Sequence, residues 1–117
     1  MTDQHTDPDC IFCKIVAGEM PAERLFEDDR VLAFKDISPA APVHGLVIPK
    51  RHVATLDDFA DSDESLLGHL MLVARRIAAE HDLSGYRVAM NINSLGGQVV
   101  FHAHLHILGG RQMRGLG

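Results

Sequence analysis

The chain has 117 residues, which is enough for one domain with a single hydrophobic core and too few for two. Hydrophobic residues make up 46% of the sequence and charged residues 23%, a globular composition that argues against disorder along most of the chain. The net charge of −5 gives no electrostatic footprint for a nucleic-acid polymer, and no stretch approaches the length of a membrane span. A small molecule is therefore the expected partner.

The first nine residues contain no apolar run, so they lack the features of a secretory signal. We expect a flexible tail over residues 1–9 and one domain over residues 10–117. Cys10 and Cys13 are the only cysteines, and they lie too close together in the sequence to staple a fold as a disulfide. A cytoplasmic, reducing environment fits this cysteine usage best.

The first half of the domain alternates short apolar segments with turn residues. Two aspartates between two apolar segments predict a hairpin, and two prolines in the next segment predict a loop. In chain order we expect a short helix over residues 11–16, strands over residues 24–27 and 31–35, a loop over residues 36–44 and a strand over residues 45–49.

One long helix is predicted over residues 62–81, where apolar residues recur with the helical period. Asp61 and Glu64 have the spacing of a capping box at its start, and Ser84 with Gly85 marks its end. The apolar stripe of this helix is broad enough to cover the sheet and a second subunit, although the core of a monomer requires a similar stripe.

The rest of the chain predicts two more strands, over residues 86–91 and 99–108, around a glycine-rich turn at residues 93–98. Strands joined by short turns, with one long helix on one side, are typical of an α+β domain built on an antiparallel sheet. We therefore expect a five-stranded antiparallel sheet with one long helix and one short N-terminal helix.

Three histidines, His102, His104 and His106, alternate with apolar residues in the last predicted strand. Because successive side chains of a strand point to opposite faces, the three imidazoles share one face and the apolar residues face the core. A single histidine in such a place is usually solvated or satisfied within the core, but strict alternation of three argues for function. We interpret this face as a row of groups that titrate near neutral pH.

An imidazole can attack phosphorus directly when one ring nitrogen is free and the other is held protonated. The middle histidine, His104, is the natural nucleophile, and its neighbours can bind phosphate oxygens or supply a proton to the leaving group. The turn at residues 96–98 could aim backbone N–H groups at the same phosphate. One metal ion bound by all three histidines is disfavoured, because the first and third lie about 13 Å apart along a strand, although adjacent members could share an ion.

The sequence Gly-Gly-Gln-Val-Val-Phe-His-Ala-His-Leu-His at residues 96–106 closely resembles the signature of the histidine triad (HIT) family. The resemblance covers nearly the whole chain after residue 9 and points to the Hint branch of the family. It is carried also by residues 10–15, 26–29, 36–39, 44–50, 65–71 and 108–111.

The resemblance implies a HIT-like homodimer whose two sheets join into one and which binds purine nucleoside monophosphate derivatives. It implies a hydrolase of the phosphoramidase type, which cleaves adenosine 5′-phosphoramidates to AMP and an amine through a nucleotidyl-histidine intermediate on His104 and needs no metal for catalysis. A dinucleoside polyphosphate hydrolase or nucleotidyl transferase of the same family is an alternative. So are a nucleotide-binding interaction module with little catalysis and a metal-dependent hydrolase.

The resemblance also implies roles for particular residues. His44, His102 and His106 would assist His104, and Asp36 would receive the ribose hydroxyls as an acceptor-only carboxylate, although a turn cap is the plainer interpretation of that residue. The apolar purine slot would consist of Ile11, Phe12, Ile15, Phe34 and Leu46. The phosphate would lie near Asn91, Gly97, Gln98, Val99, His104 and His106.

Val99 departs from the family pattern, because some Hint relatives carry a serine at this position. Valine has no side-chain donor, so only the backbone N–H of Val99 remains available to a phosphate. The residues after 110 also lack the tryptophan of some relatives, so the preference for a leaving group does not carry over from them.

Cys10 and Cys13 have the spacing of metal ligands, but one such pair is half of a zinc site. Resemblance to the HIT proteins that bind zinc implies His52 and His102 as the other two ligands, in a closed structural site that pins the N-terminal segment to the sheet. Two buried free thiols are the alternative. The two assignments for His102 compete, because a zinc ligand cannot also act freely as an acid.

Overall fold

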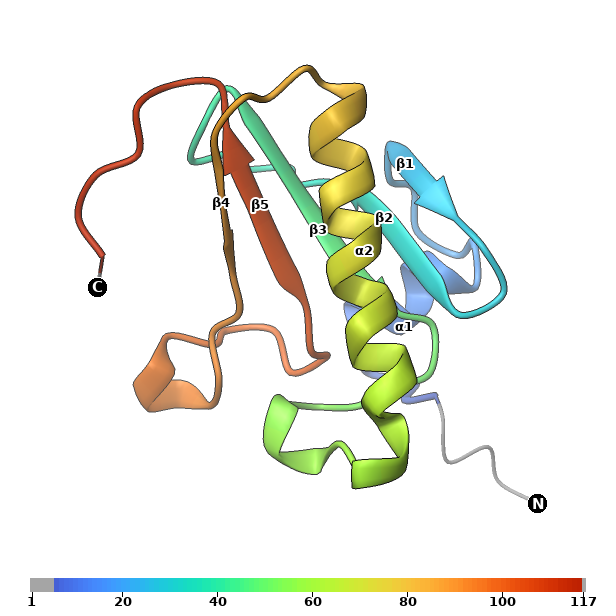
Figure 1. The fold of residues 1–117 in the computed structure, drawn as a ribbon. Helices are drawn as coiled ribbons and strands as arrows, with labels where there is room; N and C mark the ends of the chain where they lie inside the picture. The colour runs from blue at the N-terminus through green and yellow to red at the C-terminus, as the bar shows by residue number, and fades with distance from the viewer. Residues whose placement is uncertain (1–5, 117) are drawn as a thin grey trace.

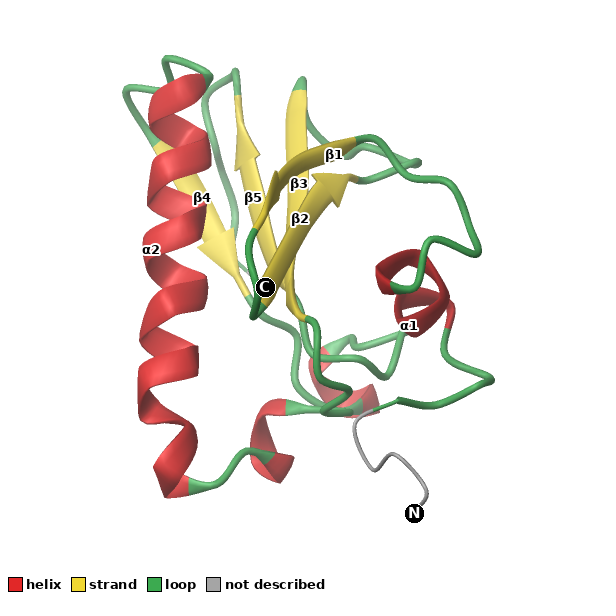
Figure 2. Cartoon of the chain, turned by 90° about the vertical axis from the view of Figure 1, so that its right-hand side faces the viewer, coloured by secondary structure: helices red, strands yellow, loops and turns green. Residues whose placement is uncertain are grey.

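The computed structural model describes residues 6–116 of the chain. Its centre is an antiparallel sheet with the strand order β1-β2-β3-β5-β4 (Figure 1). The long helix α2 (Glu64–Glu80) covers one face of the sheet, and the short helix α1 (Ile11–Val16) lies on the other side (Figure 2). The strands are β1 (Arg24–Glu27), β2 (Val31–Lys35), β3 (Val43–Pro49), β4 (Tyr86–Ala89) and β5 (Leu105–Gly109). This is the α+β architecture that the sequence predicts.

The apolar runs of the central strands are buried on both faces of the sheet. Val31 and Ala33 of β2 pack toward α2, while Leu32 and Phe34 of the same strand pack toward α1. This is why the strand reads as a continuous apolar run rather than as an alternating one. Fully burying a side chain of this kind contributes about 1.5–3 kcal/mol, so the two apolar clusters hold the helices to the sheet from opposite sides.

The start of the long helix differs from the prediction. Helix α2 begins at Glu64 rather than at residue 62, and a short 3₁₀ turn, Asp61–Asp63, precedes it. The expected capping box between Asp61 and Glu64 is wrong, since the helix start has no such side-chain bond. Instead, the carboxylate of Asp63 accepts a hydrogen bond from the N–H of Ala60 at 2.9 Å and closes the turn.

Other boundaries move by a few residues. Helix α2 ends at Glu80, one residue before the predicted end at residue 81, and Asp82 follows with a φ of 56° in the left-handed region. Strand β3 begins at Val43, two residues earlier than predicted, and β4 ends at Ala89 rather than at residue 91.

The largest difference from the prediction concerns the last strand, which the sequence predicts over residues 99–108. Strand β5 begins only at Leu105, where its partner on β3 is Val47. The segment before it leaves the sheet, because the N–H of Ala103 bonds to the carbonyl of Val53 at 2.7 Å. His102 and His104 therefore precede the strand, although the alternation persists and Ala103 is still buried.

The N-terminal segment is described in part. Residues 1–5 of the predicted tail lie outside the described residues, whereas the carbonyl of Asp7 accepts a hydrogen bond from the N–H of Cys10 at 3.0 Å. Among residues 6–116, the structure contains no helix with the length and apolar character that a membrane crossing requires.

Candidate active site and metal cluster

The three alternating histidines form part of a continuous row of imidazoles on the α1 side of the sheet. The rings of His104 and His106 lie 4.9 Å apart between centroids, and those of His106 and His44 lie 5.2 Å apart. Phe12 of α1 packs edge-on against His104 at 5.2 Å and His102 at 5.9 Å. Helix α1 therefore covers the row and excludes water from the first two members, which are 0% and 7% exposed.

His104 has a defined tautomer. Its Nδ1 lies 2.8 Å from the backbone carbonyl of His102, and because a carbonyl only accepts, Nδ1 carries the proton and donates it. The lone pair of Nε2 is then free for a substrate. Burial lowers the pKa of His104, so the ring is neutral at neutral pH and can act as a nucleophile.

His44 and His106 form a directed hydrogen-bond chain. The backbone N–H of Ala40 donates to Nδ1 of His44 at 3.0 Å, so the proton of the neutral ring is on Nε2. That Nε2 donates to Nδ1 of His106 at 2.9 Å, which leaves Nε2–H of His106 as a donor for a ligand. The backbone amide of Ala40 thus sets which nitrogen of His106 carries the proton, although the two residues lie 66 positions apart in the sequence (106 − 40).

The expected titration near neutral pH is wrong for His102 and His106, and the pKa of His104 is lowered as well. Burial, with the charges of His104 and His44 adding to it, lowers the pKa of His106 to about 4. Burial also lowers the pKa of His102 to about 4 and that of His104 below its usual value. At neutral pH these imidazoles are uncharged hydrogen-bonding groups rather than cations.

Asp36 follows β2 and has one carboxylate oxygen toward a turn and one toward the histidines. Oδ1 accepts a hydrogen bond from the N–H of Ser38 at 2.8 Å, and Oδ2 lies 3.5 Å from Nε2 of His44. The carboxylate therefore caps a turn and also adjoins the row of imidazoles, so the two interpretations of this residue are compatible.

Four residues gather at the other end of the row: Cys10, Cys13, His52 and His102. Nδ1 of His102 lies 3.3 Å from Sγ of Cys10, 3.6 Å from Sγ of Cys13 and 3.3 Å from Nδ1 of His52, while Sγ of Cys13 lies 3.4 Å from Nδ1 of His52. Adjacent ligand atoms of a tetrahedral zinc ion lie about 3.3 to 3.8 Å apart, since Zn–N and Zn–S bonds are about 2.0 and 2.3 Å long. The four donor atoms fit such an ion.

The surroundings of the cluster also suit a metal. Nε2 of His102 donates to the carbonyl of Pro49 at 2.7 Å, which leaves the lone pair of Nδ1 directed at the cluster. Burial raises the pKa of the Cys13 thiol to about 11, so without a metal this thiol is protonated, and a bound cation would replace that proton. The imidazole of His102 is thus directed to Pro49 and the cluster, and it is the backbone carbonyl of His102 that bonds to His104.

A second group of possible ligands, Asp36, His44 and His106, is less suited to a metal. Nε2 of His44 carries the only proton of its ring, because Nδ1 accepts from Ala40. A metal on Nε2 would have to displace that proton and leave an imidazolate. A metal-dependent hydrolase that uses this group is therefore disfavoured among the alternatives.

The residues of the expected purine slot come together on the α1 side of the sheet, with one exception. Phe12, Ile15, Phe34 and Leu46 belong to one buried cluster, in which the rings of Phe12 and Phe34 meet edge-on at 5.4 Å. Ile11 does not belong to this cluster and is 41% exposed.

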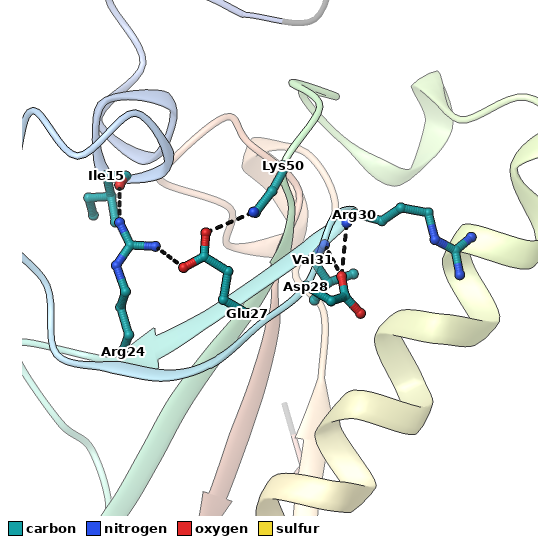
Figure 3. A network of polar contacts seen from close by, with 7 residues as sticks. All are labelled: Ile15, Arg24, Glu27, Asp28, Arg30, Val31 and Lys50. Atoms are coloured by element: carbon teal, nitrogen blue, oxygen red, sulfur yellow. Dashed lines mark hydrogen bonds and ion pairs between the residues drawn. The ribbon is translucent and has the colours of Figure 1, made fainter.

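A polar network that the sequence did not reveal ties α1 to the sheet (Figure 3). Arg24 donates to the carbonyl of Ile15 at 2.9 Å and to the carboxylate of Glu27 at 2.9 Å (Figure 3). Lys50, just after β3, meets the other oxygen of Glu27 at 2.7 Å. Only the topology brings these residues together.

The glycine-rich turn does not present its amides as expected. The N–H groups of Gly96 and Gln98 both bond to the carbonyl of Asn93, and that of Gly97 bonds to the carbonyl of Ser94, each at 3.0 Å. The expectation that these three amides face a phosphate is therefore wrong in this structure. Gly97 has a φ of 91°, which explains the glycine at this position.

Two groups beside the turn remain open. Within residues 6–116, neither the backbone N–H of Val99 nor the side-chain amide of Asn91 has a hydrogen-bond partner. Val99 is 86% exposed, and Val100 packs against the apolar cluster that holds Phe12. The open N–H group therefore lies on the segment that leads from the turn to the histidines.

Comparison with known proteins agrees with this fold. The family model of the HIT domain matches residues 17–113. The structure of a HIT family hydrolase from Legionella pneumophila Philadelphia 1 is similar, with 53% identity, a TM-score of 0.89 and coverage of 91% of this chain and 96% of that chain. A histidine triad protein from Clostridium difficile is 45% identical with a TM-score of 0.92, covering 96% and 99%.

An uncharacterised HIT-like protein of Synechococcus elongatus is 49% identical over 106 residues, which cover 90% of this chain and 93% of that protein. The fold and the triad define a histidine triad protein. The chain belongs to the HIT family, and it resembles the family's hydrolases.

Proposed function

We propose that the chain is a Hint-type hydrolase that cleaves nucleoside 5′-phosphoramidates to a nucleoside monophosphate and an amine. The observation that carries the proposal is the tautomer of His104, whose Nδ1–H is held by a carbonyl at 2.8 Å while Nε2 is free. A neutral, buried and oriented imidazole is what nucleophilic attack on phosphorus requires. The similar structures described as HIT family hydrolases, from Legionella pneumophila and Clostridium thermocellum, support a hydrolytic reaction.

In the first step, Nε2 of His104 attacks the α-phosphorus, a P–N bond to the ring forms and the P–N bond to the amine breaks, while the departing nitrogen takes up a proton from solvent. The carbonyl of His102 stabilises the ring, which becomes positively charged while it carries the nucleotidyl group. In the second step water attacks the same phosphorus and regenerates His104. Over both steps, water supplies the hydroxyl that ends on phosphorus and the proton that ends on the amine.

His106 and the segment before β5 act on the phosphate. The hydrogen bond from His44 directs Nε2–H of His106 outward as a neutral donor to a phosphate oxygen. The N–H of Val99 and the amide of Asn91 are further donors, because neither has a partner within the described residues. Such donors stabilise the charge that develops on the phosphate oxygens.

The apolar cluster under α1 receives the purine, and Asp36 receives the ribose hydroxyls. A purine offers a flat apolar face to Phe12, Ile15, Phe34 and Leu46, whereas Asp36 offers carboxylate oxygens that can only accept. Apolar contacts of this kind discriminate weakly between bases, so adenine and guanine derivatives are both substrates.

The cluster of Cys10, Cys13, His52 and His102 holds zinc as a structural ion. When bound, zinc supplies a cross-link between α1, the end of β3 and the segment before β5, and it takes no part in the reaction. The four distances between donor atoms support this assignment.

A second copy of the chain pairs along β4 to form a homodimer. Strand β4 is an edge of the sheet, and such an edge offers unpaired backbone groups to another strand. Met71 and Leu72 of α2 are 51% and 47% exposed, and they supply apolar contacts for the partner.

The test of the proposed function uses purified protein and adenosine 5′-phosphoramidate, with released AMP and the intact mass of the protein as readouts. We expect AMP release by the unmodified chain and a transient nucleotidyl adduct on His104. His104→Ala should release no AMP and still bind it. Binding of AMP without turnover in the unmodified protein would contradict the proposal and favour the nucleotide-binding module.

A further inference from the structure

Gln98 is a buried amide that is fully engaged with backbone groups. Gln98 is only 4% exposed, and its Oε1 accepts a hydrogen bond from the N–H of Asn93 at 2.9 Å. Its Nε2 donates to the carbonyls of Ala54 and Val100, at 2.7 and 3.0 Å. These three bonds leave the side chain no free proton with which to bind a phosphate.

The three bonds of Gln98 define the shape of the turn. The bond to Asn93 closes the turn across residues 93–98, and Asn93 is held at a φ of 63° in the left-handed region. The bond to Ala54 ties the turn to the connection after β3, and the bond to Val100 fixes the chain just beyond the turn. One side chain thus links the closed turn to the segment that enters the histidine row.

This arrangement determines which backbone amide is open. The N–H groups of Gly96, Gly97 and Gln98 are directed into the turn, and within the described residues the first N–H without a partner after them is that of Val99. Val99 lies between Gln98 and Val100, the two positions that the amide of Gln98 holds together. A change in the bonds of Gln98 therefore alters the direction of the Val99 N–H directly.

We infer that Gln98 is a positioning residue, which makes no contact with substrate and holds the backbone N–H of Val99 toward the α-phosphate. The inference rests on the proposed function, because it assumes a nucleotide phosphate beside the histidines. It replaces the expectation that Gln98 itself binds the substrate. The valine is tolerated at position 99 because the contribution comes from its backbone, which Gln98 orients.

The experiment compares binding of AMP and of adenosine by calorimetry in two variants. Gln98→Met removes all three bonds at similar volume, whereas Gln98→Glu keeps the acceptor for Asn93 and loses the donors to Ala54 and Val100. The matched control, Gln112→Met, makes the same chemical change at an exposed glutamine. Thermal unfolding of each variant shows whether it retains the fold.

We expect both Gln98 variants to bind AMP about tenfold more weakly, because a charge-assisted hydrogen bond to the phosphate is lost. Binding of adenosine, which lacks the phosphate, should change less than about twofold, and Gln112→Met should match the unmodified chain for both ligands. Equal loss for AMP and adenosine would show a general structural role and overturn the inference, as would unchanged AMP binding in a variant that folds.

A second measurement on the unmodified chain covers the case in which neither variant folds. In an NMR titration, AMP should shift the amide resonance of Val99 strongly and adenosine should not, while the amides of Gly96 and Gly97 move little. Shifts centred on the glycines instead would overturn the inference. Both readouts are of binding, so a chain that binds AMP but shows no turnover contradicts the proposed function and still tests Gln98.

Discussion

The backbone carbonyl of His102 accepts the Nδ1–H of His104 at 2.8 Å, while the imidazole of the same His102 belongs to the cluster with Cys10, Cys13 and His52. A single residue thus connects the candidate metal site to His104, the proposed nucleophile. Helix α1 makes a second connection, because it begins at the two cysteines and places Phe12 against His104. We therefore expect binding of a metal in the cluster to be coupled to the orientation of His104.

Loss of a cluster ligand outside the triad should reveal this coupling. His52→Ala removes one ligand, so we expect bound zinc to fall from about one ion per chain to a small fraction, with a lower melting temperature and weaker AMP binding. Elemental analysis, thermal unfolding and calorimetry measure these effects. His81→Ala, which changes a histidine at the end of α2, is the control and should leave zinc content and AMP binding unchanged. Full zinc content in His52→Ala would rule out the four-ligand site.

The stability of the fold should decrease as the pH falls from about 6.5 to about 4. The pKa of His106 is lowered to about 4 in the folded chain from its ordinary value of 6.5, so between these values the unfolded chain binds the additional proton. Above pH 6.5 the ring is neutral in both states, and the free energy of unfolding has its full value. As the pH falls below 6.5, the free energy of unfolding decreases by about 1.4 kcal/mol per pH unit for each proton that only the unfolded chain binds.

Urea unfolding at several pH values between 4.5 and 7.5 tests this linkage. His106→Asn removes the titrating group, so its free energy of unfolding should depend less steeply on pH than that of the unmodified chain. The lowered pKa values of Asp28 and Glu27 affect stability at lower pH and should act equally in both proteins. Identical slopes in the two proteins would show that His106 titrates normally.

The sequence was sufficient for the features that depend on local patterns. The alternation at residues 102–106, the cysteine spacing and the hairpin turn are each visible within a few positions, and the structure agrees with them. The pairing of His102 with Pro49 spans 53 residues, and the start of β5 depends on the bond from Ala103 to Val53. No local pattern encodes such long-range contacts.

The protonation and hydrogen bonding of the site residues were less predictable from the sequence than which residues lie in the site. The expectation of histidines that titrate near neutral pH failed because the burial of His106 under neighbouring rings cannot be read from a strand pattern. The amides of Gly96 and Gly97 bond within the turn, and only the backbone conformation reveals this. The direction of the proton on His44 likewise depends on the amide of Ala40, whose side chain gives no sign of that role.

Arg24 should contribute to nucleotide binding through α1. It joins the carbonyl of Ile15 to Glu27, so Arg24→Met frees the end of α1 and should raise the KM for the phosphoramidate about three- to tenfold while kcat changes little. A ribose 5′-phosphoramidate without a base should show no change in KM, because it does not use the apolar cluster. Arg30→Met, at an exposed arginine, is the control. Equal effects on both substrates would assign Arg24 a general structural role.

The backbone N–H of Ala40 should be needed for catalysis, because it sets the proton positions on His44 and, through it, on His106. Ala40→Pro removes this donor and keeps the carbonyl that accepts from Arg111, so we expect kcat to fall about tenfold with a smaller change in KM. Nitrogen-15 NMR of the imidazoles should then show His44 in a mixture of tautomers. Ala40→Gly retains the N–H and should keep the single tautomer and most of the activity. Equal losses of kcat in the two variants would mean that the conformation of the loop, and not the hydrogen bond, is what the histidines require.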